Sequence, residues 1–373
     1  MSARKLLWLA IVVVVIVGAV WYRRSQPAPP AIPLGTALEI KAPVGLPPVP
    51  IPADNPPTAE TIVLGRKLYY DPLLSVDNTV SCASCHAPYL GFSDGKPVSE
   101  GVNGQTGTRN APTVINAAYL TTQFWDGRAP SLEKQAEGPV QNPVEMANTL
   151  EAVEKKLTAD PTYRAAFKAA FGRDRISYEM VEKAIASFER TVLAGNSPFD
   201  RYFYQGDNTA LSESAKRGLE VFRNPDQGNC AACHTIGKNY ALFTDNKFHN
   251  LGVGVTTGVT GEAVLSDLGR YEVTQNEADQ GAFKTPTLRN IAHTAPYMHD
   301  GSLKTLKDVI DFYIGGGNSN PYLDPEIHAL DFLSGQERDD LLAFLESLTG
   351  EFPYEVGPPG KVKKQASGES RGE

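Results

Sequence analysis

The sequence predicts an all-α protein of two fused, similar domains with long loops, preceded by an N-terminal transmembrane helix. One short cysteine motif occurs twice, with its first cysteines at positions 82 and 230. Apolar residues recur at helical spacing, while strand-like segments are few and short. A chain of 373 residues is also long enough for two domains of roughly 100–200 residues each.

The N-terminal segment 1–24 is predicted to be a membrane anchor or a signal sequence. Its apolar stretch from Leu6 to Tyr22 is flanked by basic residues on both sides. Seventeen residues fall within the range of roughly 17–25 that can span a bilayer. A cleaved signal peptide is the alternative. Because two arginines stand where a small-residue cleavage site is expected, an uncleaved anchor is favoured.

Two further segments are predicted to lie outside the domains. Segment 25–57 contains eleven prolines and no periodic apolar pattern, which predicts an extended Pro-rich tether. The polar tail 351–373 is predicted to be disordered. The two domains are therefore expected at 58–205 and 206–350.

The four cysteines form two C-x-x-C-H strings: Cys82, Cys85 with His86, and Cys230, Cys233 with His234. This string is the attachment signature of c-type haem, in which both thiols bond to the porphyrin and the histidine ligates iron. A redox C-x-x-C pair does not require the histidine. A Cys₄ zinc site would leave both histidines unexplained. The chain is predicted to carry two covalent haem c groups in two cytochrome c-like domains.

Helical patterns surround both motifs. Segments 65–72 and 218–225 each run from a glycine through an amphipathic stretch to a proline shortly before the haem motif. This degenerate repeat predicts duplication of one fold. Apolar residues from Val181 to Val192 follow i, i+3, i+4, i+7 spacing. Ser334 with Glu337 forms a capping-box pattern before a final helix.

Charge and cofactor chemistry restrict the compartment and the partners. A net charge of −8 and a pI near 5.4 argue against a nucleic-acid partner, which would require a basic patch. Haem c is attached outside the cytoplasm. The protein is therefore expected in the periplasm, anchored to the inner membrane by its N-terminal helix.

The positions of the histidines predict different coordination for the two haem irons. No histidine lies between His86 and His234, so the first domain offers its iron no second histidine. Met146 and Met180 are alternative ligands. A six-coordinate iron passes electrons, whereas an iron with an open face can bind peroxide or dioxygen. We expect the first haem to have an open face.

Four strings resemble the bacterial di-haem cytochrome c peroxidase family, which includes the MauG proteins. They are Gln123-Phe-Trp-Asp-Gly-Arg128, the segment from Gln135 to Met146, Lys284-Thr-Pro-Thr-Leu-Arg-Asn290 and Pro296-Tyr-Met-His-Asp-Gly301. The resemblance extends from about Leu64 to Leu348. It implies that the first haem reacts with peroxide and that the second receives electrons.

The resemblance also implies roles for individual residues. Glu145 would act as acid–base over the open first haem, a role that suits a carboxyl in a partly dry pocket. Gln135 and Pro139 would line that pocket. Trp125 would relay electrons between the haems. Family members also carry calcium between the domains, and the matching ligands are the Asn110 side chain with the Thr294 and Pro296 carbonyls.

Two positions depart from the typical peroxidase. Many family members place a histidine near the position of Val102, where it blocks the first iron until the enzyme is reduced; valine cannot ligate iron. The usual distal methionine of the second haem would fall fourteen residues after His299, at Tyr313. Tyrosine occupies this position in MauG-like members. Met298 is the competing ligand.

The leading hypothesis is an enzyme that reduces hydrogen peroxide to water or uses it for MauG-like oxidation. Its electron source would be a small cytochrome c, a cupredoxin or a protein substrate, and a homodimer is compatible with the sequence. The alternative from another class is a membrane-tethered electron-transfer cytochrome without catalysis. A ligand-binding haem sensor is a third interpretation.

Overall fold

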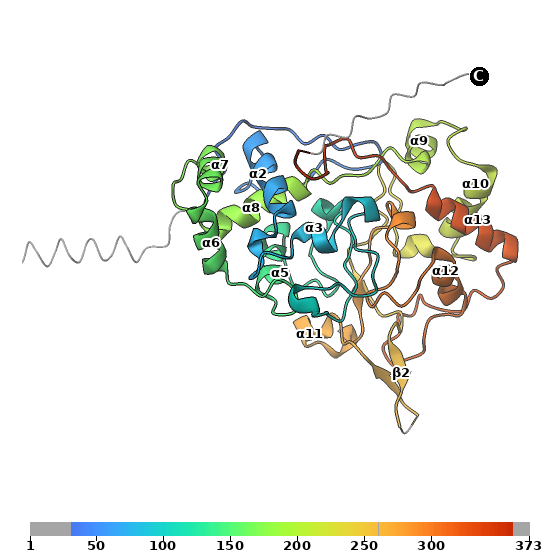
Figure 1. Ribbon diagram of the computed structural model, residues 1–373. Coiled ribbons are helices and arrows are strands. Elements are labelled where there is room, and N and C mark those ends of the chain that lie inside the picture. Colours follow the sequence, from blue (N-terminus) through green and yellow to red (C-terminus); the bar gives the residue numbers. More distant parts are fainter. Residues whose placement is uncertain (1–30, 260, 361–373) are drawn as a thin grey trace, which may run out of the picture.

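Two pairs of crossing helices organise the residues that the computed structural model describes, 31–259 and 261–360 (Figure 1). In the first half α2 (Ala59–Tyr70) packs on α8 (Tyr178–Glu189). In the second half α10 (Glu213–Arg223) packs on α13 (Gly335–Glu346). This arrangement repeats in both halves and gives two mostly helical, cytochrome c-like domains.

Each crossing depends on one glycine. A Cβ added to Gly65 would lie 1.8 Å from the Ala184 carbonyl oxygen, and one added to Gly218 would lie 1.9 Å from the Asp340 carbonyl oxygen. No side chain can occupy such a gap, so the helices touch backbone to backbone. The glycine that opens each predicted repeat is therefore a packing requirement.

Local signals account for the helix ends. The Ser334 side chain accepts from Glu337 N and the Glu337 carboxylate accepts from Ser334 N, which confirms the predicted capping box. The periodic segment from Val181 forms α8, whose residues are almost all buried. Val192, predicted on the same helical face, lies beyond the end of α8 at Glu189.

The other elements complete the two domains. The first contains α3 (Cys82–Cys85), α4 (Leu132–Gln135), α5 (Glu137–Gln141), α6 (Leu150–Ala159) and α7 (Pro161–Phe171), with short 3₁₀ turns at Pro72–Leu74, Pro88–Leu90, Val102–Gly104 and Ala117–Tyr119. Helix α9 (Pro198–Gln205) follows them and packs in the core of the second half, where Phe199 contacts Phe243 and Phe344. The second contains α11 (Tyr271–Thr274) and α12 (Leu306–Ile314), with 3₁₀ turns at Cys230–Ala232, Glu277–Asp279 and Ile291–His293.

Strands are short, and they make the class mostly helical instead of purely helical. Strand β1 (Phe248–His249) pairs antiparallel with β4 (Phe283–Lys284). Strands β2 (Val255–Thr257) and β3 (Ala263–Leu265) form a hairpin that projects from the body (Figure 1).

Equivalent hydrogen bonds show that the duplication extends beyond the helices. Asn116 and Asn290 both adopt a left-handed backbone, with φ of 59° and 58°. The Asn116 side-chain oxygen accepts from Ala194 N, and the Asn290 side-chain oxygen accepts from Gly350 N. Each asparagine thus ties its turn to the segment that follows the last helix of its own domain.

The proline-rich segment is not a free tether over residues 31–57. Ala31 is fully buried in the core of the first domain, and Asn55 donates to the Glu133 carboxylate. The Gly45 carbonyl accepts from Arg289 of the second domain. The tether prediction is wrong for this stretch, because its apolar side chains and carbonyl groups find partners on both domains.

The disorder predicted for the tail is also wrong for residues 351–360. The Arg66 side chain binds the Glu355 carboxylate, and Tyr70 donates to the Val356 carbonyl. The predicted anchor 1–24 and the tail beyond residue 360 lie outside the described residues. Among residues 31–259 and 261–360, no helix combines the length and the apolar character needed to cross a membrane.

Candidate functional site

The first haem motif presents one imidazole nitrogen for a metal. The Phe92 carbonyl lies 3.2 Å from His86 Nδ1, and since a carbonyl can only accept, Nδ1 carries the proton. Nε2 is left with a free lone pair. Burial lowers the pKa of His86, which favours the neutral, ligating form. Tyr69 fixes the segment by donating to the His86 carbonyl at 3.0 Å.

The second motif repeats this device. His234 Nδ1 donates to the Phe243 carbonyl at 2.9 Å, and burial lowers the pKa of His234. Phe92 and Phe243 both adopt positive φ, 57° and 52°, which turns their carbonyls toward the imidazoles. Two thiols, one oriented imidazole and a mainly apolar wall are the groups that a covalent haem requires. The chain carries two c-type haems.

The second-haem cavity is a single apolar space around the Cys230 and Cys233 thiols and His234. Its wall includes Tyr313 and Ile310 of α12, Leu341 and Leu345 of α13, and Met298. Burial raises the pKa of Tyr313 well above its ordinary value. The cavity therefore contains both of the predicted distal-ligand candidates.

The turn that carries Trp125 recurs in the second domain with His299 in its place. The isolated bridge Gln123–Ala129 closes the first turn and Tyr297–Leu303 closes the second. Phe124 and Met298, which precede Trp125 and His299, have φ of 67° and 71°. The unusual backbone of Met298 is thus a property of the shared turn and does not by itself indicate a ligand.

Tyr313 and Pro139 occupy equivalent positions in the sequences that follow these two turns. Ser131 and Thr305 cap the helices that follow the two turns, each six residues after Trp125 or His299. Pro139 and Tyr313 both lie eight residues after that cap. The second domain has a phenol at this position, on the wall of its cavity, and the first has a proline, whose side chain has no donor atom for iron.

Glu145 lies in a tight turn after α5. Asn142 Nδ2 donates to Glu145 Oε1 at 2.6 Å, and Glu145 N donates to the Asn142 carbonyl at 3.0 Å. Burial raises the pKa of the Glu145 carboxyl, while the Asn142 hydrogen bond and the charge of Arg128 oppose that rise. A partly buried carboxyl of this kind is suited to act as a general acid–base.

The loop before Asn110 lies directly on this turn. Val102 N donates to the Glu145 carbonyl at 2.8 Å, and the Val102 side chain is buried in the same apolar cluster as Met146 and Met180. Gln135 ends α4 and is half-buried. The structure thus brings Val102 and Glu145 together, in the domain that contains His86.

Trp125 lies at the boundary between the domains. Its indole Nε1 donates to the Asn110 carbonyl at 2.9 Å, and its own carbonyl accepts from Lys284 N at 2.8 Å. Trp125 also lines the second-haem cavity. Trp125 is therefore bonded to both domains, through its indole on one side and its backbone carbonyl on the other, and it is half-buried.

Charged groups fasten this boundary. Arg109 forms a bidentate pair with Asp267 at 2.7 and 2.8 Å, and it binds Asp126 beside Trp125. Arg270 donates to the Asp126 and Gly127 carbonyls at 2.9 and 3.1 Å. Two arginines, one from each domain, thus hold the Trp125 turn in place.

The three predicted calcium ligands line the same cavity wall. The Asn110 side-chain nitrogen donates to the Lys96 carbonyl at 2.8 Å, which leaves Oδ1 as the free oxygen of that amide. Asn110 N donates to the His299 carbonyl at 2.6 Å. Asn110 thereby links the first domain to the Pro296–Gly301 turn.

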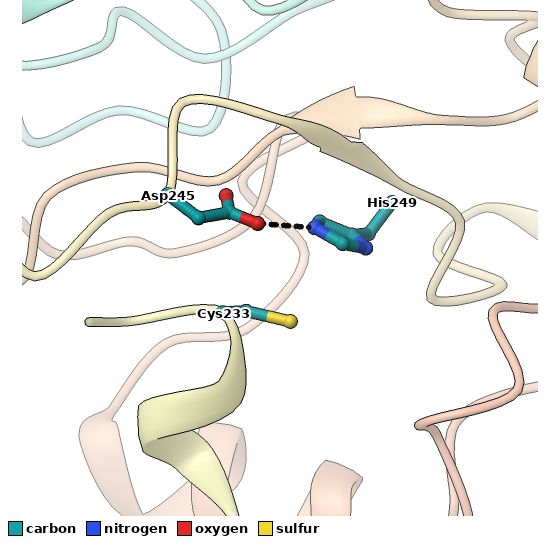
Figure 2. Close-up of side chains that lie close together, drawn as sticks. All are labelled: Cys233, Asp245 and His249. Carbon is teal, nitrogen blue, oxygen red and sulfur yellow. Dashed lines mark hydrogen bonds and ion pairs between the residues drawn. The ribbon is translucent and has the colours of Figure 1, made fainter.

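In the described part of the chain, one group of His, Cys, Asp and Glu side chains is close enough to hold a metal: Cys233, Asp245 and His249 (Figure 2). Carboxylates occupy both His249 nitrogens, Asp324 at 2.6 Å from Nδ1 and Asp245 at 3.0 Å from Nε2. In the chain without haem, contacts with Cys233, Asp324 and Asp245 raise the pKa of His249. Haem attachment removes the Cys233 contribution, and the two carboxylates remain to favour the imidazolium. An imidazolium between two carboxylates explains this cluster, because haem attachment consumes the Cys233 thiol.

Sequence reasoning missed three residues at these sites. Asn142 and Arg128 both lower the pKa of Glu145, Asn142 by a hydrogen bond and Arg128 by its charge. Both residues lie within the family-like strings 123–128 and 135–146. Lys284 is almost fully buried, and its ammonium donates to the Thr122 carbonyl at 2.6 Å beside Trp125. A lysine in an otherwise apolar, Thr- and Pro-containing run is a signal that could have identified it.

Comparisons with known proteins match both halves of the chain to families of haem proteins. A family model for di-haem cytochrome c peroxidase matches residues 59–209, and a cytochrome c model matches residues 215–349. The chain is 42% identical over 306 residues to methylamine utilization protein MauG of Methylorubrum extorquens, covering 81% of this chain and 82% of that protein. It is 38% identical over 307 residues to cytochrome c peroxidase Ccp of Escherichia coli, covering 82% of this chain and 62% of that protein.

Solved structures give the same fold. The crystal structure of a MauG-like protein associated with microbial copper homeostasis matches with a TM-score of 0.76 and 34% sequence identity. The match covers 84% of this chain and 96% of that one.

Proposed function

Since this chain belongs to the di-haem cytochrome c peroxidase family, which includes the MauG proteins, it is an enzyme that acts on peroxide, and we propose that peroxide reacts at the first haem. The observation that carries this assignment is the contrast between Pro139 and Tyr313 at matching positions of the two domains. Val102 and Pro139, in the domain that contains His86, have no side-chain atom that can ligate iron. Glu145 supplies a half-buried carboxyl in the same domain.

Glu145 moves one proton within the substrate. Its carboxylate accepts the proton from the peroxide oxygen that approaches iron and returns it to the other oxygen, which leaves as water. Asn142 holds Oε1, so Oε2 is the atom that carries the proton. The bound haem supplies the redox chemistry. Overall, one H₂O₂, two electrons and two protons give two waters.

An experiment on the resting ferric protein separates catalysis from electron transfer alone. We expect the EPR spectrum to contain a high-spin ferric signal, and peroxide to react without prior reduction, as judged by stopped-flow absorbance. Two low-spin signals and no reaction would establish the electron-transfer cytochrome. Glu145→Gln should keep the high-spin signal and lose roughly 10²–10⁴-fold in the rate constant for peroxide.

We assign Tyr313 as the distal ligand of the second haem. Its phenol lies in the cavity that contains His234, and its hydroxyl makes no hydrogen bond to any of the described residues. A phenolate stabilises ferric over ferrous iron. Tyr313→Phe should therefore change the low-spin spectrum and raise the potential of the second haem. Met298→Leu is the matched variant, and the assignment to Tyr313 fails if only this variant alters the spectrum.

Electrons pass between the haems through Trp125 in this proposal, supported by the contacts that hold its indole at the domain boundary. Val102 and Tyr313 favour MauG-like oxidation of a protein side chain over simple peroxide removal. Incubating the peroxide-treated protein with reduced small cytochrome c, with cupredoxin and with candidate protein substrates distinguishes these donors. Rapid oxidation of the small carriers alone would favour the peroxidase.

We propose a calcium ion bound by Asn110 Oδ1 and the Thr294 and Pro296 carbonyls. These residues line one wall, and oxygen donors suit this cation. Removing calcium with a chelator should lower the interhaem electron-transfer rate, and Asn110→Ala should reproduce that loss. Calcium titration of the chelated protein by calorimetry measures the site directly; no heat of binding would reject it.

The periplasm is the proposed location, with segment 1–24 as an anchor in the inner membrane. Covalent haem attachment outside the cytoplasm supports the compartment, and the apolar run supports the anchor. Cell fractionation tests both, since recovery of the full-length protein in the soluble periplasmic fraction would remove the anchor.

A further inference from the structure

A buried carboxyl at the end of α8 has no role in the peroxide chemistry proposed for Glu145. Glu189 is 5% exposed, and its Oε2 atom has no hydrogen-bond partner among the described residues. Burial raises the pKa of Glu189 to about 8. Buried polar atoms without partners are uncommon, so this one requires an explanation.

The neighbouring charges only partly offset the burial of Glu189: Arg190 lowers the pKa of Glu189, Glu133 raises it, and Arg190 Nη1 also has no hydrogen-bond partner among the described residues. The nearest cation, Arg190, uses Nη2 to bind Glu133 Oε1 at 2.8 Å, and the Asn55 amide donates to the same oxygen at 2.8 Å. Arg190 and Glu133 therefore balance one another. An ionised Glu189 would add an uncompensated buried charge, which is unfavourable in a low-dielectric interior. Glu189 is thus the member of this group that holds a proton.

The internal duplication places Glu189 on the wall of the first-haem pocket. Phe188 and Phe344 take equivalent positions, since each packs against the glycine of the crossing helix. Their Cβ atoms lie 3.0 and 2.9 Å from the point that a Cβ on that glycine would occupy. The residue after Phe344 is Leu345, which lines the second-haem cavity. Glu189 is its counterpart in the first domain.

Electrostatic effects support this placement. After burial, the Glu189 carboxylate is the main cause that raises the pKa of the Cys82 thiol. It also contributes to the raised pKa of Tyr69, whose hydroxyl contacts the His86 carbonyl. The carboxyl therefore lies beside the edge of the first haem that bonds to Cys82.

We propose that Glu189 is a redox-linked proton site of the first haem. Its Oε2 takes up one proton from solvent when that haem accepts one electron from a reductant, and it releases the proton when the electron leaves. The reason is charge: a ferric haem core carries one more positive charge than a ferrous one and favours the carboxylate. This inference is independent of where peroxide reacts.

The other groups that face Glu189 do not titrate in the same range. They are Arg190, Glu133, Tyr69 and Cys82. The guanidinium stays charged and keeps Glu133 ionised. Burial holds the pKa of Tyr69 well above neutrality, and Cys82 becomes a thioether on haem attachment. Glu189 is left as the group of this set that exchanges a proton near neutral pH.

Potentiometric titration of the di-haem protein at several pH values tests the proposal. We expect the potential of the first haem to fall with rising pH, approaching about 59 mV per pH unit, the equivalent of a tenfold change for one electron and one proton. Glu189→Gln and Glu189→Leu, the latter copying the second domain, should reduce this slope markedly. Glu145→Gln measures the part of the slope that Glu145 contributes, since the pKa of that carboxyl is also raised, and the second haem is an internal reference.

Haem propionates are present in every variant and cannot produce a difference between them. An equal slope in the wild type and in both Glu189 variants would overturn the proposal. Should the variants fail to fold, redox-difference infrared spectra of the wild type decide the question. A protonated-carboxyl band that appears on reduction and remains in Glu145→Gln supports Glu189 as the site, and absence of such a band refutes it.

Discussion

The ion pair between Arg289 and Asp200 offers a quantitative test of what holds α9 and the N-terminal segment on the second domain. Both side chains are 0% exposed, and two hydrogen bonds of 2.8 and 2.9 Å connect them. Arg289 belongs to the second domain and Asp200 to α9. The same guanidinium donates to the Gly45 carbonyl at 2.7 Å. One group thus connects three segments that are distant in sequence.

Asp200→Ala leaves a guanidinium buried without a counter-charge. Such a change costs about 3–5 kcal/mol of the free energy of unfolding. Urea unfolding of the di-haem protein, followed by circular dichroism, measures the loss. The double variant Asp200→Leu with Arg289→Met removes both charges and should lose less than Asp200→Ala alone, since replacing a buried pair by apolar groups is often neutral.

The exposed pair Lys96–Glu100 is the matched control. Its side chains are 48% and 57% exposed, so Glu100→Ala should leave the urea midpoint unchanged. A loss below about 1 kcal/mol for Asp200→Ala would contradict the reasoning, as would a double variant whose loss equals the sum of the two single losses.

Four further outcomes are expected. Gly218→Ala should lower the free energy of unfolding by about 1–3 kcal/mol, since its Cβ would overlap the Asp340 carbonyl. Gly335→Ala is the control, because open space surrounds Gly335, and its urea midpoint should not change. Equal urea midpoints for the two variants would disprove the contact. Trp125→Phe should keep the peroxide reaction but slow interhaem electron transfer in stopped-flow traces; an unchanged rate would exclude the relay. The peroxide rate constant should rise with pH through the raised pKa of Glu145, because the carboxylate is the base, and Glu145→Gln should lose this dependence. The pKa of Glu189 is raised to about 8, so its contribution to stability is complete below the pKa of a free Glu and is lost as pH rises toward 8; denaturation of Glu189→Gln should show a flatter decline, and parallel curves would rule this out.

Local patterns in the sequence were sufficient for several elements. The capping box at Ser334, the periodic helix from Val181 and the glycine at each helix crossing are encoded within a few residues of one another. Haem attachment follows from five consecutive residues, and the histidine that would ligate each iron is among them. Such features depend on short-range geometry and chemistry.

Long-range pairing could not be predicted in this way. The prolines of 31–57 indicate an extended backbone, but nothing near them shows that the Gly45 carbonyl would meet Arg289. Glu133 and Arg190 are likewise 57 positions apart in the sequence and become partners only after folding. For the site, the sequence indicated Glu145 through a family motif, whereas its contacts with Asn142 and Arg128 required three-dimensional placement.

The match between Pro139 and Tyr313 has a consequence for the polarity of the molecule. The two haems are surrounded by two similar backbone folds. The backbone alone therefore does not decide which haem receives electrons and which one reacts. The direction of electron transfer, from the domain that receives electrons to the domain that uses them, must then depend on side chains that differ at equivalent positions. Swapping a few such residues between the copies is a shorter route to reversing that direction than rebuilding either half.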